Sequence, residues 1–316
     1  MRSLTDEPDL KNFGNLYMIL DVAVEKIIEV VLKTIGALPK KYHSYCSILI
    51  GRLWYYTDRR HRNITIENIT LAYNNELNSY QVEQLSKAVF SSFAKSILEI
   101  CWSLNLNKEQ FRQYFDTSDI FHLTKAHNKN KGVLILSGHL GIWEFLPHIL
   151  SIEGYRGSSI YRPIDYKPLD VLIKKMRSRY GAGLIPVSGS SKKIRETLNE
   201  NKLVGLLIDQ NANYKNGVAI DFFNRRTLGN KGLAVLAMVT GSPVVPVFSI
   251  RMGDKFKLIC GPEIPLIKTG DRRKDIELNT QKYNKVIEEY IRCFPDQWFW
   301  VHRRWKTKIS SPWPGK

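Results

Sequence analysis

The chain has 316 residues, of which 43% are hydrophobic and 11% aromatic. This composition excludes a disordered protein and is sufficient for a sizeable core, in one large domain or two small ones. Lysine and arginine number 47 against 30 aspartate and glutamate residues, a formal charge of +17, so the expected partners are anionic: nucleic acid, acidic lipid headgroups, phosphorylated substrates or an acidic carrier protein.

The first predicted element is an amphipathic helix over residues 16–35. Charged side chains interrupt its apolar residues, so no apolar run reaches membrane-spanning length and no transmembrane helix is predicted. Asp21, Glu25 and Glu29 recur every four residues and form one narrow stripe. The wide apolar face that remains could pack in the core, against a partner or at a membrane interface.

The next part of the chain, up to residue 131, is predicted to be mainly helical. Helical patterns cover residues 45–56, 64–73 and 79–104, and Ser79 is the predicted N-cap of the third. A basic cluster over residues 59–62 separates the first two helices and is expected to be a solvated turn or a phosphate contact.

After this helical part, short apolar strands alternate with helices, which predicts an α/β fold with a mixed, largely parallel central sheet covered by helices. We expect a single domain over residues 1–316, with a mainly helical N-terminal region (1–125) and an α/β catalytic core (126–316). The predicted strands are 132–136, 158–161, 185–187, 203–208, 220–223, 244–250 and 255–260, and the predicted helices are 169–180, 192–199, 233–239 and 275–294.

The most informative stretch is Gly132-Val-Leu-Ile-Leu-Ser-Gly-His-Leu-Gly-Ile-Trp-Glu-Phe145. It begins like a buried strand, breaks at a Ser-Gly pair and resumes as a helix. His139 would lie at the turn and Glu144 in the first turns of the helix, where a carboxylate can orient a histidine that acts as a general base. Within one continuous helix, residues five apart lie about 140° apart around the axis and could not pair.

The His-x4-Asp/Glu spacing is weak evidence by itself. In a chain with seven histidines it is expected about once by chance, and His148 with Glu153 supplies a second match. That second pair falls in a continuous helix and is not expected to meet. From spacing and context alone, His139 is as readily a structural turn histidine as a catalytic one.

Two more polar residues, Arg162 and Asp209, directly follow predicted strands. Because active-site residues gather at the carboxyl ends of parallel strands, one site could hold His139, Arg162 and Asp209.

The four cysteines form no Cys-x-x-Cys and are expected to be reduced, mostly buried thiols. The chain also lacks dinucleotide, Walker, serine-hydrolase and metal-binding motifs. A base without a protein nucleophile indicates direct transfer to a substrate hydroxyl.

Five motifs follow one another along the chain. They are Ser137-Gly-His-Leu-Gly-Ile-Trp-Glu144, Tyr161-Arg-Pro163, Asp209-Gln210, Thr240-Gly-Ser-Pro-Val-Val-Pro246 and Gln297-Trp-Phe-Trp-Val-His-Arg-Arg-Trp-Lys306. In this order they resemble the bacterial lipid A late acyltransferases, the lauroyl and myristoyl transferases of the His-x4-Asp/Glu superfamily. Residues 60–73 also resemble the N-terminal region of that family, so the resemblance covers most of the chain.

The resemblance implies a glycerolipid-acyltransferase-like fold and transfer of a fatty acyl chain to a hydroxyl of a phosphorylated glycolipid, such as a lipid A precursor. The donor would be an acyl carrier protein thioester or acyl-CoA, and the net charge favours the acidic carrier protein. No metal or other cofactor is implied. The enzyme would act at the cytoplasmic face of the inner membrane, bound peripherally or at the interface.

Roles for single residues follow from position in these motifs. His139 would take the proton of the acceptor hydroxyl, and Glu144 would orient His139. Arg162 would bind phosphate or stabilise the oxyanion, which suits a planar, permanently charged guanidinium. Asp209 would line the substrate site, although a strand-end cap or salt-bridge partner is an equal alternative. Arg177 is a further substrate-binding candidate, on a helix face that is by default solvated.

The aromatic and basic tail contributes the last two substrate-binding candidates, Arg303 and Arg304. Its aromatic residues could stack on bases or sit at a headgroup boundary, or the tryptophans could pack against the sheet, which we expect for about half of them. The rival function is a nucleic-acid-binding α/β protein with no enzymatic role. It does not explain a histidine and a glutamate at a strand-to-helix turn, so no nucleic-acid partner is expected; an acyltransferase with a different glycolipid acceptor is the other alternative.

Overall fold

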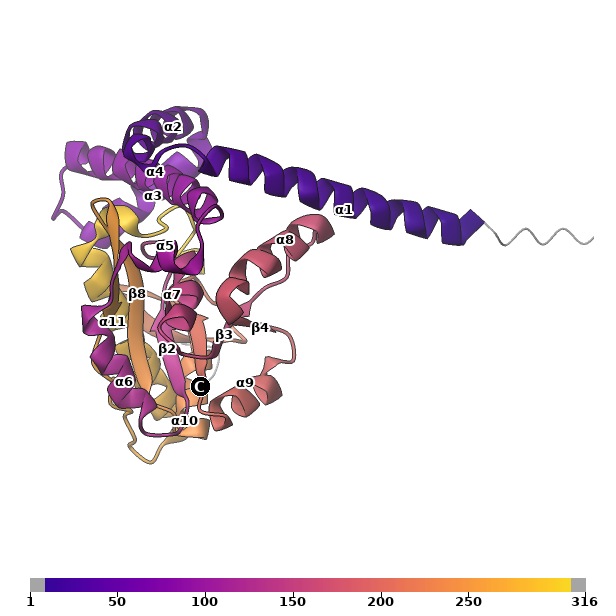
Figure 1. Ribbon diagram of the computed structural model, residues 1–316. Helices are drawn as coiled ribbons and strands as arrows, with labels where there is room; N and C mark the ends of the chain where they lie inside the picture. The colour runs from indigo at the N-terminus through magenta and orange to yellow at the C-terminus, as the bar shows by residue number, and fades with distance from the viewer. Residues whose placement is uncertain (1–8, 308–316) are drawn as a thin grey trace, which may run out of the picture.

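The computed structural model describes the backbone of residues 9–307 and the side chains of residues 20–307. Its main sheet has seven strands in the order β1-β9-β8-β2-β5-β3-β4 (Figure 1). Five of them (β4, β3, β5, β2 and β8) run parallel, and β9 is antiparallel to β8. The predicted mixed, largely parallel α/β sheet is therefore confirmed. The strands are β1 (Phe115–Asp116), β2 (Val133–Ser137), β3 (Gly157–Tyr161), β4 (Gly183–Pro186), β5 (Leu203–Leu207), β8 (Val244–Met252) and β9 (Lys255–Cys260).

Helices cover both faces of this sheet, which is why the first four residues of β2 are apolar and all five are buried. Val133 and Ile135 face α5 (Lys108–Arg112), α6 (Phe121–His127) and α7 (Leu146–Ile152). Leu134 and Leu136 face the opposite core cluster. That cluster contains residues of α9 (Ser190–Asn199), α10 (Gly232–Thr240) and α11 (Arg272–Cys293).

The N-terminal region consists of helices, and those after the first lie over the end of the sheet at which the parallel strands finish (Figure 1). The N-terminal helices are α1 (Asp9–Gly36), α2 (His43–Thr57), α3 (Arg59–Tyr73) and α4 (Ser79–Ser103), which confirms a helical N-terminal region. The predicted N-cap of α4 is wrong by one residue: Asn78 accepts from the backbone N of Gln81, and the Gln81 side chain accepts from Asn78 N, because an asparagine can form this reciprocal capping box. A buried ion pair of 2.8 Å between Glu99 of α4 and Arg251 of β8 ties the two regions together.

The long helix α1 leaves the body as an arm beside α8 (Lys167–Arg177). Its acidic stripe faces α8, where Lys175 pairs with Glu29 at 2.9 Å. Its apolar residues do not enter the core: Ile27 and Val30 are each 62% exposed. No helix among the described residues is long and apolar enough to cross a membrane.

The remaining elements are short. A separate hairpin pairs β6 (Gly217–Phe222) with β7 (Arg225–Asn230).

The four cysteines are free, and two of them, Cys101 and Cys260, are buried. The predicted single domain stays a prediction, and its ends, 1–8 and 308–316, lie outside the described residues. The 3-10 helices are η1 (Lys40–Tyr42), η2 (Ser118–Ile120), η3 (Trp143–Phe145), η4 (Arg179–Gly181) and η5 (Pro295–Gln297).

Candidate active site

His139 lies in the loop that follows β2, as the sequence predicts. The loop runs over residues 138–142 and continues as η3 and then α7. Gly141 has φ +65°, and a Cβ built there would lie 2.1 Å from the backbone oxygen of Ser249. Only glycine therefore allows the loop to turn this close to β8.

The side chain that orients His139 is Asp209, which follows β5. Asp209 Oδ1 lies 2.9 Å from His139 Nδ1, and Oδ2 accepts from the backbone N of His139 at 2.9 Å. Trp298 Nε1 donates to the same Oδ2 at 2.8 Å. Since β2 and β5 are parallel neighbours with Ser137 opposite Leu207, their ends bring the two side chains together. Asp209 is fully buried.

The pair is electrostatically coupled. Burial opposes protonation of His139, but the charge and hydrogen bond of Asp209 outweigh it, so the pKa of His139 is raised above its ordinary value. Burial also opposes ionisation of Asp209, yet His139, the nearby His302 and the Trp298 donor hold the pKa of this carboxyl well below its usual range. Asp209 is therefore an anion that stabilises the imidazolium form of His139.

The other ring nitrogen of His139, Nε2, has the side-chain amide nitrogen of Gln210 as its neighbour, 3.4 Å away. A carboxylate only accepts hydrogen bonds, so the pairing with Asp209 assigns the proton of the neutral ring to Nδ1 and leaves Nε2 as an acceptor. The His139 side chain is 20% exposed, and its ring lies 5.1 Å from that of Trp143 and 6.1 Å from that of Phe299. A buried carboxylate and a fixed tautomer are features of a general base, the role that the sequence predicts for His139.

The prediction that Glu144 orients His139 is wrong in this structure. Glu144 lies in η3, and its carboxylate accepts two hydrogen bonds from the guanidinium of Arg177, at 2.8 Å from Nε and 2.5 Å from Nη2. Trp143 Nε1 lies 3.2 Å from Glu144 Oε1. The loop before η3 turns the carboxylate toward Arg177 of α8, so Glu144 acts on His139 only through its charge, which raises the pKa of the ring.

The substrate-binding candidates separate into buried and exposed groups. Asp209 is not a substrate contact, because its buried oxygens are occupied by His139 and Trp298. Arg304 is also wrongly predicted: it is fully buried and donates to Thr227 Oγ1 at 3.1 Å and to a backbone oxygen of β7 at 2.9 Å. Arg162 and Arg303 are exposed. Arg162 follows β3 and His139 follows β2, so both lie at the carboxyl end of the parallel strands.

The second His-x4-Glu match does not form a pair. His148 Nε2 lies 2.8 Å from the backbone oxygen of Met176, and Glu153 pairs with Arg112. In the tail, Trp298 and Trp300 are buried and Trp305 packs against the same core cluster. The prediction that about half of the tail tryptophans pack inside is therefore too low for the described residues.

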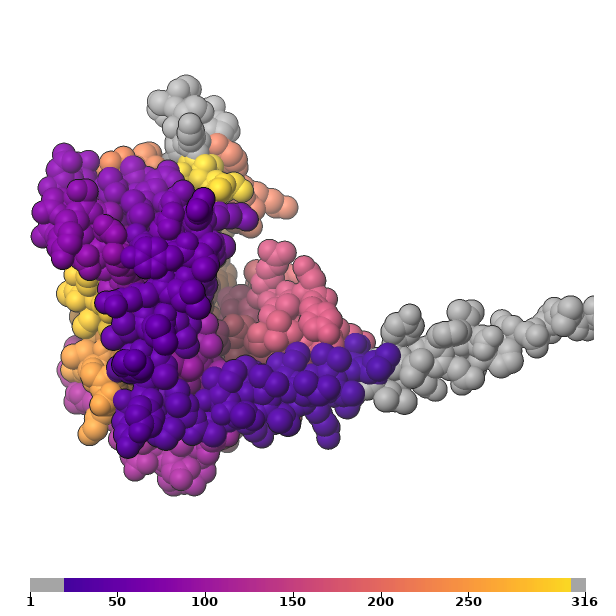
Figure 2. All heavy atoms as spheres, turned by 90° about the horizontal axis from the view of Figure 1, so that it is seen from above, coloured from indigo at the N-terminus to yellow at the C-terminus, as the bar shows by residue number. Residues whose placement is uncertain are grey.

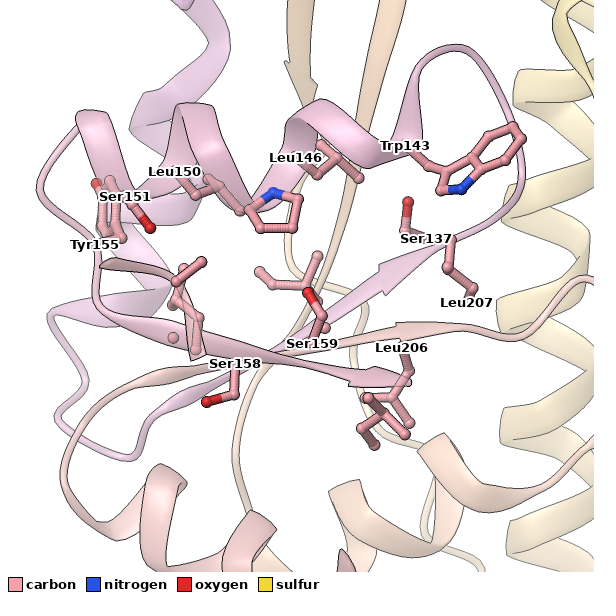
Figure 3. Close-up of a pocket in the computed structure, with 17 residues that line it drawn as sticks. Ser137, Trp143, Leu146, Leu150, Ser151, Tyr155, Ser158, Ser159, Leu206 and Leu207 are labelled. Carbon is pink, nitrogen blue, oxygen red and sulfur yellow. The ribbon is translucent and has the colours of Figure 1, made fainter. Parts of the chain in front are cut away.

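An apolar channel lies between α7 and strands β2, β5 and β3 (Figure 3). Leu146 and Leu150 of α7 form its roof, and the hydroxyls of Ser137 and Ser159 point toward it from the strands. Trp143, which contacts the His139 ring, lies at one end. The free space is narrow, about 70 Å³, and its lining is mostly apolar.

The channel exists because small residues replace core side chains on this face of the sheet. Ile135, Gly205 and Ser159 lie opposite one another across β2, β5 and β3, and Gly157 lies on the same face. A Cβ at Gly205 would have its nearest neighbour 3.7 Å away, at Ser159 Oγ. Ser137 Oγ, close to His139 in the chain, is buried and has no hydrogen-bond partner among the described residues.

Of the two alternatives that the sequence left open for Asp209, the structure shows the salt-bridge partner, paired with His139. The role of Trp298 was missed. The usable signal for Asp209 was its position directly after an apolar strand, together with the likelihood that two such strands are neighbours in a parallel sheet. Nothing in the spacing of the tail identifies the Trp298 indole as a donor to that carboxylate.

Residues 10–307 match the protein family described as bacterial lipid A biosynthesis acyltransferase. The chain is 22% identical over 253 residues to the lipid A biosynthesis palmitoleoyltransferase of Escherichia coli K12, covering 79% of this chain and 80% of that protein. It is 22% identical over 278 residues to the lipid A biosynthesis lauroyltransferase of the same organism, covering 85% and 86%. Its identity to the phosphatidylinositol mannoside acyltransferase of Mycolicibacterium smegmatis is 23% over 243 residues, covering 72% and 75%.

The family match includes the His139 loop, Asp209 and Trp298, and it confirms the resemblance found in the five sequence motifs. The chain therefore belongs to the bacterial lipid A biosynthesis acyltransferase family and is an enzyme that transfers acyl groups.

Proposed function

We propose that this enzyme transfers a fatty acyl chain from an acyl carrier protein thioester to a hydroxyl of a phosphorylated glycolipid, at the cytoplasmic face of the inner membrane. The observation that carries the proposal is the position of His139, with Nδ1 held by Asp209 and its ring against Trp143 at the end of the apolar channel. The acyl chain would lie in this channel, with its thioester carbon beside His139.

The reaction needs no protein nucleophile. His139 Nε2 takes the proton of the acceptor hydroxyl while the hydroxyl oxygen attacks the thioester carbonyl carbon. The new C–O bond forms, the tetrahedral oxyanion collapses and the C–S bond breaks. The imidazolium, stabilised by Asp209, returns its proton to the leaving thiolate. Ser137 Oγ, buried and without a partner in the part of the chain that the structure describes, is available to donate to the developing oxyanion.

Support for a glycolipid acceptor comes from the relatives, whose names specify lipid A or phosphatidylinositol mannoside biosynthesis. Arg162 and Arg303 are exposed and suited to acceptor phosphates. Arg177, already held by Glu144, would act as a fixed cation at the edge of the site. The net charge of +17 favours both a phosphorylated acceptor and an acidic carrier protein.

Support for attachment at the membrane interface comes from the outer faces of α1 and α2. Tyr45, Leu49, Leu53 and Tyr56 recur along α2, and each is more than half exposed. The arm formed by α1 adds further exposed apolar residues and extends beside α8 (Figure 2). Apolar faces this large on the surface are typical of proteins that bind a membrane or a partner.

The decisive experiment is an acyl-transfer assay. The protein is incubated with acyl carrier protein carrying a labelled fatty acid and a tetraacylated, phosphorylated disaccharide acceptor, in parallel with His139→Ala and with labelled acyl-CoA as the alternative donor. We expect labelled glycolipid with the wild type and none above background with His139→Ala. Lys192→Gln, an exposed change on α9, is the control and should match the wild type.

Three outcomes would contradict parts of the proposal. No transfer to this acceptor or to any phosphoglycolipid tested would reject the proposed reaction. Full activity of His139→Ala would reject the site assignment alone. Faster transfer from acyl-CoA than from the carrier protein would replace the proposed donor.

A further inference from the structure

A second hollow, separate from the α7 channel, lies between α2 and α4. It encloses about 520 Å³, within the range of about 300–1,000 Å³ typical of small-molecule sites. The two helices touch at Gly51, where a Cβ would lie 2.5 Å from Ser91 Cα. This close approach fixes one wall of the hollow, which we call the α2–α4 pocket.

The α2–α4 pocket is lined by cations and hydroxyl groups. Lys95 is partly buried, and its Nζ donates to Ser44 Oγ at 2.8 Å. Lys87 also lines the pocket and pairs with Glu83 at 2.7 Å. Arg52 is exposed on α2, and neither it nor Lys95 has an ion pair with any described carboxylate.

The other acidic groups nearby form no ion pair with Arg52 or Lys95. Glu99, one turn after Lys95, is committed to the buried guanidinium of Arg251, with oxygens 2.9 and 3.1 Å from Nε. Asp296 is the acidic residue of the lining, and burial raises its pKa. Burial also lowers the pKa of Lys95, so an anion bound beside it would relieve the cost of its partial desolvation.

The floor of the pocket is connected to the loop that carries His139. Gln297 lines the pocket, and its side chain bonds the backbone of Arg251, accepting at 3.0 Å and donating at 3.1 Å. Its backbone oxygen accepts from Gly141 N at 3.0 Å. The pocket and the His139 loop therefore share one supporting segment, although their side chains face different spaces.

We propose that the α2–α4 pocket binds a phosphate group, held by Arg52 and Lys95 with help from the pocket hydroxyls. A guanidinium and an ammonium beside several hydroxyl donors match the charge and the several acceptor oxygens of phosphate better than the two oxygens of a carboxylate. The phosphate can belong to a lipid headgroup or to a soluble phosphorylated compound. The site depends only on its own residues and does not require the proposed acyl transfer.

The first arm of the test measures binding of inorganic phosphate and of glycerol 3-phosphate to the full chain by calorimetry at constant ionic strength. Arg52→Gln/Lys95→Gln should raise Kd about tenfold or more, because it removes two charge-assisted partners. Lys192→Gln/Lys193→Gln on α9 removes the same charge from exposed lysines elsewhere. This control should leave Kd within about twofold, since distant exposed charges are screened.

A second variant guards against a folding defect in the first. Gln84 is exposed and lines the pocket, so Gln84→Glu adds a negative charge there without disturbing the core. It should weaken phosphate binding, whereas Gln113→Glu, at an exposed position outside the pocket, should not. Unchanged binding in both pocket variants, or equal losses in pocket and control variants, would overturn the proposal.

The vesicle arm identifies the source of the phosphate. Sedimentation compares phosphatidylcholine vesicles that contain phosphatidic acid with vesicles in which a fatty acid anion supplies the same charge. Loss of the preference for phosphatidic acid in Arg52→Gln/Lys95→Gln assigns the pocket to a lipid headgroup. Loss of soluble phosphate binding with an unchanged vesicle preference assigns it to a soluble ligand.

Discussion

Asp209 Oδ1 lies 2.9 Å from His139 Nδ1, although 70 residues separate them along the chain. The pairing is fixed by the backbone register of β2 and β5, which places Ser137 opposite Leu207 just before both side chains. Gly138 contributes as well, since a Cβ there would lie 3.2 Å from Asp209 Cγ. The base and its carboxylate are thus positioned by the most buried part of the sheet.

Asp209→Asn should impair acyl transfer far more than Glu144→Gln. The amide can donate to Nδ1 and favour the wrong tautomer, a change that costs roughly 10³–10⁴-fold in kcat in histidine–aspartate systems. Glu144 contacts Arg177 instead, so its loss should cost much less. The measurement is the initial rate with saturating donor, with Asp221→Asn on the exposed hairpin as the control. A larger loss in Glu144→Gln would mean that Glu144, and not Asp209, acts on the base.

Activity should fall at acidic pH, in a range set by the raised pKa of His139. The base works only when neutral, so kcat/KM should rise with pH through that pKa, above the ordinary value of about 6.5. Asp209→Asn removes the main cause of the raised pKa of His139. In this variant the rise of kcat/KM should therefore occur at lower pH. The check is a pH–rate profile with an NMR titration of the His139 ring. A rise of kcat/KM at the same pH in Asp209→Asn as in the wild type would contradict the prediction.

The same pair should stabilise the fold in a defined pH range. Because the folded-state pKa of His139 is raised, its contribution to the free energy of unfolding is fully present below about pH 6.5 and is lost as the pH rises through the folded value. The Tm difference between wild type and His139→Gln should therefore shrink as the pH is raised. A difference that grows with pH would show that protonation of His139 opposes folding.

Gly141→Ala should destabilise the protein and abolish activity, whereas Gly241→Ala should only destabilise it. Both glycines have nearly the same backbone angle, φ +65° and +66°, and an alanine there costs about 1–2 kcal/mol. Only at Gly141 would the Cβ also meet backbone, the oxygen of Ser249, while nothing lies within 4 Å at Gly241. Thermal unfolding and the transfer assay measure both effects. Equal Tm losses in the two variants would reject the importance of the Ser249 contact.

Gly205→Val should shorten the acyl chains that the enzyme accepts. The nearest neighbour of an added Cβ is 3.7 Å away, so the fold should tolerate the change while the branched side chain fills the middle of the channel. We expect transfer of long chains to fall about tenfold or more relative to short ones, since an overfilled apolar site costs roughly 1–3 kcal/mol. Competing acyl donors of different length provide the measurement. An unchanged preference would place the acyl chain elsewhere.

The architecture could be predicted because its signals are local. The apolar run of β2 followed by Ser-Gly-His, the strand before Asp209 and the long helices α4 and α11 are visible in the pattern of neighbouring side chains. The N-cap of α4 was missed by one residue because Asn78 and Ser79 are both good caps, and only the capping box decides between them.

The partner of His139 could not be predicted because it depends on which strands are neighbours. Spacing favours Glu144, five residues away, but the turn at Gly141 and the 3-10 geometry of η3 direct that carboxylate to Arg177. Asp209 becomes adjacent only through the pairing of β2 with β5. In the same way, Arg304 has the composition of a phosphate ligand, and only the packing of the tail against β7 shows that it is buried.

The donation from Trp298 to Asp209 has a consequence for biosynthesis. Translation produces His139 first, then Asp209, and Trp298 only much later. A nascent chain that has left the ribosome as far as β7 already contains the base and its carboxylate, but it lacks the indole donor and β8, the strand that supports the His139 loop through Ser249. Enzymatic activity should therefore arise late in synthesis, so that a partly made chain does not transfer acyl groups.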